Sequence, residues 1–204
     1  MPTRLLITAC LALLLTAACS AGTSHAAPSQ PLTGNPADRL VDLPIDPYRY
    51  DHANRCRRSP APGTLALQAW LTAHVRGVSW GIMRCERLSH QSFSLHSEGR
   101  ALDWHLDVGD RTDRRAARKI IRLLLATDKA GNPHALARRM GVQEIIWDCR
   151  SWWSGSDGMG DYSVCFDSKG NAVRNVSPTL AHRDHIHFGL SRAGAAKRTS
   201  FWRR

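Results

Sequence analysis

The sequence predicts an α+β fold formed by one domain. Two segments, residues 64–75 and 110–128, have the apolar spacing of amphipathic helices. Short segments typical of strands lie around them, at residues 78–85, 100–106, 142–148 and 184–190. No internal repeat is visible, and the roughly 160 residues after position 41 are enough to bury one core. We therefore expect helices and strands to share a single core.

The first half of this domain is predicted to contain a helix and two strands. The helix over 64–75 stops before Gly77, and a strand over 78–85 follows it. Gly99 permits a tight turn, after which residues 100–106 alternate as a strand does. Asp103 then points to one face of that strand.

The second half is predicted to contain two helices and two strands. In the helix over 110–128, one face is apolar and the opposite face is basic. The apolar face consists of Ala117, Ile120, Ile121 and Leu124, and the basic face of Arg114, Arg115, Arg118, Lys119 and Arg122. Asn132 is the expected N-cap of a short helix with Pro133 in its first turn, ending by Gly141. A strand over 142–148 and a long loop rich in Gly, Ser and Asp lead to the last strand.

The N-terminus has the pattern of an export signal. Arg4 precedes an apolar stretch, residues 5–18, that is too short to span a membrane comfortably. Leu15-Thr-Ala-Ala-Cys19 resembles a bacterial lipobox, in which the cysteine is lipidated, and cleavage after Ala21 or Ala27 is the alternative. We expect an export signal over 1–19, a flexible tether over 20–41 and the folded domain over 42–204.

Four cysteines remain after this leader region. An even number in an exported chain favours two disulfides, and four cysteines allow three connectivities. The pairs Cys56–Cys85 and Cys149–Cys165 are the expected ones, because each lies in one section of the chain. The alternative is that some of the four are free and buried.

The net charge of +11 predicts attraction to polyanions, either nucleic acid or the anionic polymers of a bacterial envelope. Solvation is sufficient to explain the arginines on the outer face of the helix over 110–128. Lys197, Arg198, Arg203 and Arg204 form a stronger candidate for a loose electrostatic contact. No nucleic-acid-binding motif accompanies the charge, so we expect no nucleic-acid partner.

Three residues have the types and number of a catalytic zinc site, namely His96, Asp103 and His187. Zinc accepts imidazole nitrogen and carboxylate oxygen, and a catalytic site leaves a fourth position to water. His105 and Asp107 share the face of Asp103 and are the main rivals for its role, and His182 lies near the second motif. We expect those three to orient the ligands or to lie at the surface.

At these positions the chain resembles a known family. Residues 94–103 carry Ser-x-His-x-x-Gly-x-Ala-x-Asp, and residues 184–187 carry Asp-x-x-His. This combination resembles the zinc D-Ala-D-Ala carboxypeptidases and endopeptidases of bacterial cell walls, which are relatives of hedgehog-type and lysostaphin-type folds. The resemblance implies a small antiparallel sheet with flanking helices, Zn²⁺ held by His96, Asp103 and His187, and Asp184 as the catalytic base. Family members with His-x-His here give His185 a role beside the metal, so either residue is a candidate base.

Other residues near the motifs have less defined roles. The resemblance implies an upstream arginine that stabilises the oxyanion; of Arg84 and Arg87, we take Arg87 as the candidate. Ser94 is expected to form a hydrogen bond near the metal, because no Gly-x-Ser-x-Gly elbow surrounds it. Trp152 and Trp153 either line a substrate groove or cap the core.

The sequence thus predicts a monomeric zinc peptidase, secreted or held at the membrane through a lipidated Cys19. The substrate class, the D-Ala-containing peptide stems of peptidoglycan, comes from the resemblance and the export signal. Two other functional classes remain as alternatives: a non-catalytic, zinc-stabilised module that binds the cell wall, and a secreted metal-dependent nuclease drawn by the basic surface.

Overall fold

The computed structural model describes residues 42–89 and 92–203. The expected export signal, the lipidation site at Cys19 and the tether lie outside the described residues. Where the chain is described, none of its helices combines the length and apolar character that crossing a membrane requires.

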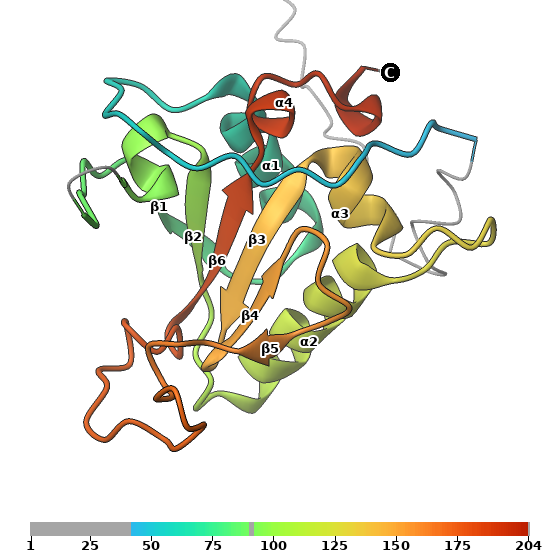
Figure 1. The fold of residues 1–204 in the computed structure, drawn as a ribbon. Coiled ribbons are helices and arrows are strands. Elements are labelled where there is room, and N and C mark those ends of the chain that lie inside the picture. Colours follow the sequence, from blue (N-terminus) through green and yellow to red (C-terminus); the bar gives the residue numbers. More distant parts are fainter. Residues whose placement is uncertain (1–41, 90–91, 204) are drawn as a thin grey trace, which may run out of the picture.

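A six-stranded antiparallel sheet forms the centre of the domain, with strand order β1-β2-β6-β3-β4-β5 (Figure 1). The strands are β1 Val78–Gly81, β2 Ala101–His105, β3 Val142–Trp147, β4 Arg150–Trp153, β5 Gly160–Asp161 and β6 His185–Leu190. The last strand in the sequence, β6, lies between β2 and β3 and pairs with both. Residues near position 100 are therefore brought beside residues near position 187.

Four α-helices accompany the sheet in the described part of the chain. They are α1 Pro62–His74, α2 Arg111–Leu125, α3 Ala135–Met140 and α4 Arg192–Ala195, with two short 3₁₀ helices, η2 Leu95–Glu98 and η3 Ser200–Trp202. The predicted α+β class and the antiparallel sheet with flanking helices are confirmed.

The two faces of the sheet have different roles. Leu102 and Trp104 of β2 and Ile186 and Phe188 of β6 are fully buried and pack in one core with α1, α2 and α3. Because side chains alternate along a strand, Asp103 and His187 point to the other face. Helix α2 turns its apolar side to the core, as predicted, with Ala117, Ile120, Ile121 and Leu124 buried.

The predicted start of the third helix is wrong. Asn132 is not an N-cap; its amide donates to Asp128, and α3 begins only at Ala135, after His134 in a left-handed conformation. The carboxylate of Asp128 also accepts from the backbone N–H groups of Ala130 and Asn132. These local hydrogen bonds compete with helix formation, so the segment forms a turn.

Two further expectations need correction. The strand expected over 78–85 ends at Gly81, whose φ is 133°, and a backbone in that conformation does not continue a regular strand. The tryptophans expected in a loop lie on β4, which pairs with β3. Alternation then separates them, with Trp152 fully buried and Trp153 36% exposed.

Both predicted disulfides, Cys56–Cys85 and Cys149–Cys165, are present, each with Cα atoms 5.5 Å apart. Disulfides persist in oxidising compartments and are rare in the cytoplasm. The chain therefore has the character of an extracytoplasmic protein.

The turn at Asp128 leads to a prediction about stability. Arg139 is only 1% exposed, and its Nη1 lies 2.9 Å from Oδ2 of Asp128. Asp128→Asn would leave the buried guanidinium without this countercharge, and we expect a loss of about 3 kcal/mol in the free energy of unfolding at neutral pH. Denaturant titration measures this loss. Asp167→Asn is the control, because the exposed Asp167 forms a similar turn with Asn171 and has no ion pair in the described part of the chain; its loss is expected to be much smaller.

The same ion pair predicts how the loss varies with pH. Burial tends to raise the pKa of Asp128, but hydrogen bonds from Asn132 and the charge of Arg139 outweigh burial and lower it. The stabilisation is therefore present above the ordinary pKa of aspartate and disappears as the pH falls through the lower folded-state value. The difference between wild type and Asp128→Asn should shrink in strong acid. If the difference in unfolding free energy stayed the same in strong acid, the ionised carboxylate of Asp128 would not be its source.

Candidate metal centre

Three buried ligand atoms form a nearly equilateral triangle on the open face of the sheet. Nε2 of His96, Oδ1 of Asp103 and Nδ1 of His187 lie 3.1 Å from one another, pair by pair. A tetrahedral zinc ion with bonds near 2 Å places its ligand atoms about 3.3 Å apart. The predicted residues thus form a group that fits a metal ion, with one position left for water.

The sheet register positions two of these ligands. Asp103 of β2 and His187 of β6 are direct partners across the antiparallel pair. Their Cα atoms are therefore held at the spacing of neighbouring strands, about 5 Å, and both side chains stand on the same face. The relative position of Asp103 and His187 is therefore set by the sheet and not by a loop.

The third ligand comes from η2, a single turn held at both ends. Ser94 caps its start, accepting from the N–H of His96, and Gly99 closes it with φ 66°. Ser94 therefore orients the turn that carries His96, which agrees with its predicted role as a hydrogen-bonding residue. Gly189 of β6 makes room for the turn, because a Cβ there would lie 2.4 Å from Cδ1 of Leu95.

Outer partners fix the orientation of both imidazoles. Nδ1 of His96 donates to the carbonyl oxygen of Ile82 at 2.8 Å, so Nε2 faces Asp103. Nε2 of His187 lies 3.5 Å from Oε1 of the buried Glu144, so Nδ1 faces Asp103. Tyr50 donates its hydroxyl to the second oxygen of Glu144 at 3.0 Å. Such partners commonly orient metal-binding imidazoles.

The local charges favour an ionised carboxylate at the cluster. Burial alone would raise the pKa of Asp103, but its contacts with His187 and His96 outweigh burial and hold this pKa well below its usual range. Burial lowers the pKa of His96, which keeps that imidazole neutral. For His187, Asp103 and Glu144 outweigh burial and raise the pKa, so a metal ion and a proton would compete for this imidazole.

Asp184 and His185 form a pair at the edge of the cluster. Oδ1 of Asp184 lies 2.7 Å from Nδ1 of His185, and its Oδ2 accepts from the hydroxyl of Thr179 at 2.6 Å. Nε2 of His185 lies 3.6 Å from Oδ1 of Asp103. Asp184 therefore orients the imidazole of His185, whose other nitrogen faces the ligand triangle.

The three residues that the sequence offered beside the ligands make other contacts. Nδ1 of His105 donates to the backbone carbonyl of Asp184 at 2.8 Å, and its ring stacks on Trp80 at 4.3 Å between centroids. The exposed Asp107 accepts from the N–H of Gly109. His182 lies 4.6 Å from His185 between ring centroids, and its burial, with the neighbouring histidines, lowers its pKa to about 3. It stays neutral beside the ligands.

Arg84, rather than Arg87, lies at the ligand triangle. Nη1 of Arg84 is 2.7 Å from Oδ2 of Asp103, and its Nε is 3.0 Å from Glu86. Arg87 instead places its guanidinium 4.9 Å from the centroid of the Phe93 ring. It is not among the described residues that line the cavity above the cluster. A role of Arg87 at the oxyanion stays a prediction without geometric support, and Arg84 is the better placed cation.

The ligand triangle opens into a cavity of about 630 Å³. Asp103, His185 and His187 are on its wall, together with Tyr50 and Trp153. Four of its lining residues are exposed and apolar: Leu88, Trp153, Val164 and Leu180. Trp152 therefore fills the core, as one of the two expectations had it, whereas Trp153 lines the cavity.

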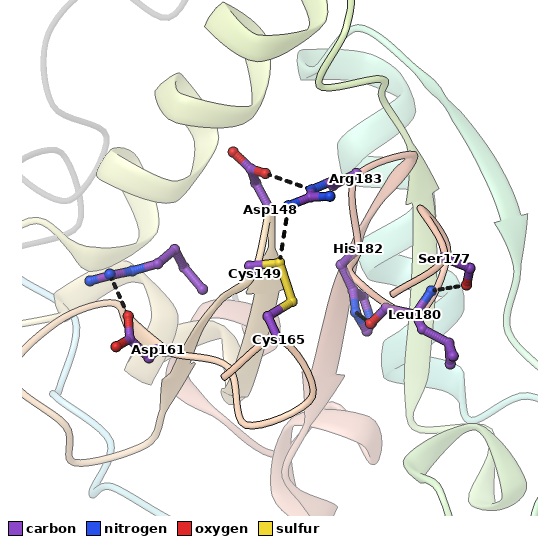
Figure 2. Close-up of a disulfide and its surroundings, with 9 residues drawn as sticks. Asp148, Cys149, Asp161, Cys165, Ser177, Leu180, His182 and Arg183 are labelled. Atoms are coloured by element: carbon purple, nitrogen blue, oxygen red, sulfur yellow. Dashed lines mark hydrogen bonds and ion pairs between the residues drawn. A yellow bond between two sulfur atoms is a disulfide. The ribbon is translucent and has the colours of Figure 1, made fainter. Parts of the chain in front are cut away.

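Figure 2 shows the Cys149–Cys165 disulfide near His182, which is one of the residues that line this cavity. The N–H of Cys149 donates to the carbonyl of Ala181, next to His182, and its carbonyl accepts from the N–H of Tyr162. These backbone hydrogen bonds join the turn between β3 and β4 to two segments that contribute Tyr162 and His182 to the cavity lining.

Comparison with known proteins identifies the family. A family model described as the C-terminal domain of VldE matches residues 57–174, more than half of the chain. The chain belongs to this family. The VldE C-terminal domain match includes His96 and Asp103 but ends before Asp184, His185 and His187. No curated protein and no solved structure matches the chain.

Two residues of the site were missed by the sequence analysis. Glu144 lies two residues before Ile146 on β3, so the alternation expected over 142–148 already placed it on one face. The alternation did not show which face of the strand would carry the candidate metal site. Tyr50 lies in a segment without regular structure and before the VldE match, and its sequence carried no signal of its contact with Glu144.

The contact between Glu144 and His187 predicts an effect on metal affinity. Glu144→Ala removes the group behind the metal-binding imidazole, and we expect zinc affinity to fall roughly 10–100-fold. Competition with a chromophoric chelator measures the affinity directly. Tyr50→Phe, which keeps Glu144 and removes one hydroxyl, is the control and should have a much smaller effect. Equal affinity in Glu144→Ala and wild type would remove Glu144 from the site.

Proposed function

We propose that the chain is a zinc-dependent peptidase that hydrolyses D-Ala-containing peptide stems of bacterial peptidoglycan. The observation that carries the proposal is the 3.1 Å ligand triangle beside the Asp184–His185 pair at the wall of one cavity. Zinc bound by such residues polarises a carbonyl and lowers the pKa of its water toward 7.

The chain's own residues supply the remaining steps. The Asp184–His185 pair accepts a proton from the attacking water and returns it to the leaving amine. Asp184 holds His185 in one orientation, with Nε2 toward the ligand triangle, so Nε2 of His185 is one candidate to accept the proton. Asp184 itself is the other candidate, if the ring of His185 turns away. Arg84 provides a positive charge within reach of the developing oxyanion.

The form of the cavity supports a peptide substrate. Its volume of about 630 Å³ is typical of a small-ligand site, and its exposed apolar rim suits a segment with small apolar side chains. The peptidoglycan class comes from the resemblance of the two motifs, and the extracytoplasmic character of the chain is compatible with it. We propose that the protein acts as a monomer, secreted or attached to the membrane through a lipidated Cys19.

Digestion of purified peptidoglycan and of DNA in parallel tests this function. With zinc present we expect new amine termini from peptidoglycan stems, no cleavage of DNA, and loss of activity with a chelator followed by recovery with added zinc. Cleavage of DNA alone would make the protein a nuclease. Zinc-dependent retention on peptidoglycan without any cleavage would make it a binding module, and either result would overturn the proposal.

A further inference from the structure

Helix α2 presents a row of cationic side chains on the surface opposite its apolar side. Arg111, Arg115, Arg118, Lys119 and Arg122 are all exposed, and we call them the α2 row. From Arg115 onward their spacing is i, i+3, i+4 and i+7, so they lie along one side of the helix. The row extends for roughly 16 Å along the helix axis.

Within residues 42–89 and 92–203, the side chains of the α2 row have no ion-pair or hydrogen-bond partner. The cations around them behave differently. Arg114 donates to the carbonyls of Val108 and Gly109, and Arg76 pairs with Asp113, the one acidic residue of α2. The row is therefore a net positive surface and not one half of a salt-bridge network.

The row is also unfavourable for the helix that carries it. Like charges at i, i+3 and i, i+4 repel, and every member of the row has at least one such neighbour within it. Arg111 and Arg115 lie near the N-terminus of α2, where the helix dipole disfavours cations, and only Arg122 is in the last turn, where it favours them. Helix stability therefore does not explain the arrangement, although solvation permits it.

We propose that the α2 row binds a linear, soluble polyanion of the cell envelope, a polymer with negative groups at regular intervals. A straight row of separate cations matches such a chain, because each side chain can meet one anionic group. The two disulfides are typical of a protein in an oxidising compartment outside the cytoplasm, and envelope polymers are found there. A cavity of about 200 Å³ next to the row, with Lys119 and Arg76 among its lining residues, offers room for a pendant group.

Two other kinds of polyanion fit the row less well. The exposed large apolar residues of the described chain all lie outside α2, so the helix has none to insert into a bilayer. The row contains no aromatic residue on which nucleic-acid bases would stack. Its position also separates it from the metal site, because α2 packs on the core face of the sheet and the ligand triangle opens on the other face. The polymer and the peptide substrate can bind together.

Binding of long-chain inorganic polyphosphate to the full chain tests the proposal. Arg115→Gln, Arg118→Gln, Lys119→Gln and Arg122→Gln combined remove four charges, and glutamine keeps a good helix propensity. We expect at least a tenfold loss of affinity, and a salt dependence whose slope falls by about 0.7 for each phosphate that is no longer neutralised. Cleavage of a small stem peptide should be unchanged, and the thermal midpoint should not fall, because the substitutions relieve repulsion along the helix.

Two control variants distinguish binding by the α2 row from a general effect of net charge. Replacing the exposed Arg55, Arg57, Arg58 and Arg174 by glutamine removes the same charge elsewhere, and Lys197→Gln with Arg198→Gln tests the C-terminal cations. We expect each to lose no more than about threefold, as distant surface charges are screened. An equal loss in any of these variants would reduce the effect to net charge and overturn the proposal. So would row-dependent binding to anionic phospholipid vesicles or duplex DNA that exceeds binding to polyphosphate.

Discussion

Asp184→Asn is expected to lower turnover of a D-Ala-containing stem peptide by about 10²–10⁴-fold while zinc stays bound. Asp184 is not part of the ligand triangle, and its carboxylate instead holds Nδ1 of His185 at 2.7 Å. An asparagine offers either a neutral acceptor or an N–H at this position, so the imidazole loses its ionised partner and its preferred tautomer. Steady-state kinetics and elemental analysis of the same preparation measure both properties.

Comparison with His185→Ala decides which residue is the base. If His185 takes the proton, its removal costs at least as much turnover as Asp184→Asn, and the double variant loses little more than either single one, because the two act as a unit. If Asp184 takes the proton, His185→Ala is the milder change. Thr179→Val, which removes only the hydroxyl that donates to Asp184, is the control and should be mild in both cases. Normal turnover in both Asp184→Asn and His185→Ala would refute the mechanism even with the metal site intact.

His96→Ala and His187→Ala are expected to lose nearly all bound zinc and all zinc-dependent turnover. Each substitution removes one of the three residues that could hold the ion, and the two that remain are fewer than the three protein ligands of a catalytic zinc site. We expect one zinc ion per wild-type chain and little in either variant after dialysis, measured by elemental analysis. His105→Ala, on the same strand face as Asp103, is the control and should keep its zinc. Full retention in His96→Ala or His187→Ala would remove that residue from the ligand set.

The sequence was sufficient for features that depend on local spacing. The α2 segment has the same buried residues as its apolar periodicity predicts, because a helix fixes which side chains share a face. Gly99 forms the tight turn expected after His96, since its φ of 66° suits a residue without a Cβ. The cysteine pairs followed from their positions in the chain. Local spacing failed at Asn132, where a side-chain hydrogen bond to Asp128 replaced the helix cap.

The residues of the candidate metal centre were also recognisable from the sequence, but their arrangement was not. The motifs named His96, Asp103 and His187, whereas the 3.1 Å triangle exists because β6 lies between β2 and β3 in a register that pairs Asp103 with His187. The same strand order brings Glu144 behind His187. The placement of Arg84, rather than Arg87, at Asp103 was equally invisible in the sequence. Periodicity reports which residues share a face within a few positions of the chain, while strand order and register are set by packing between distant segments, so only the tertiary structure decides which side chains meet.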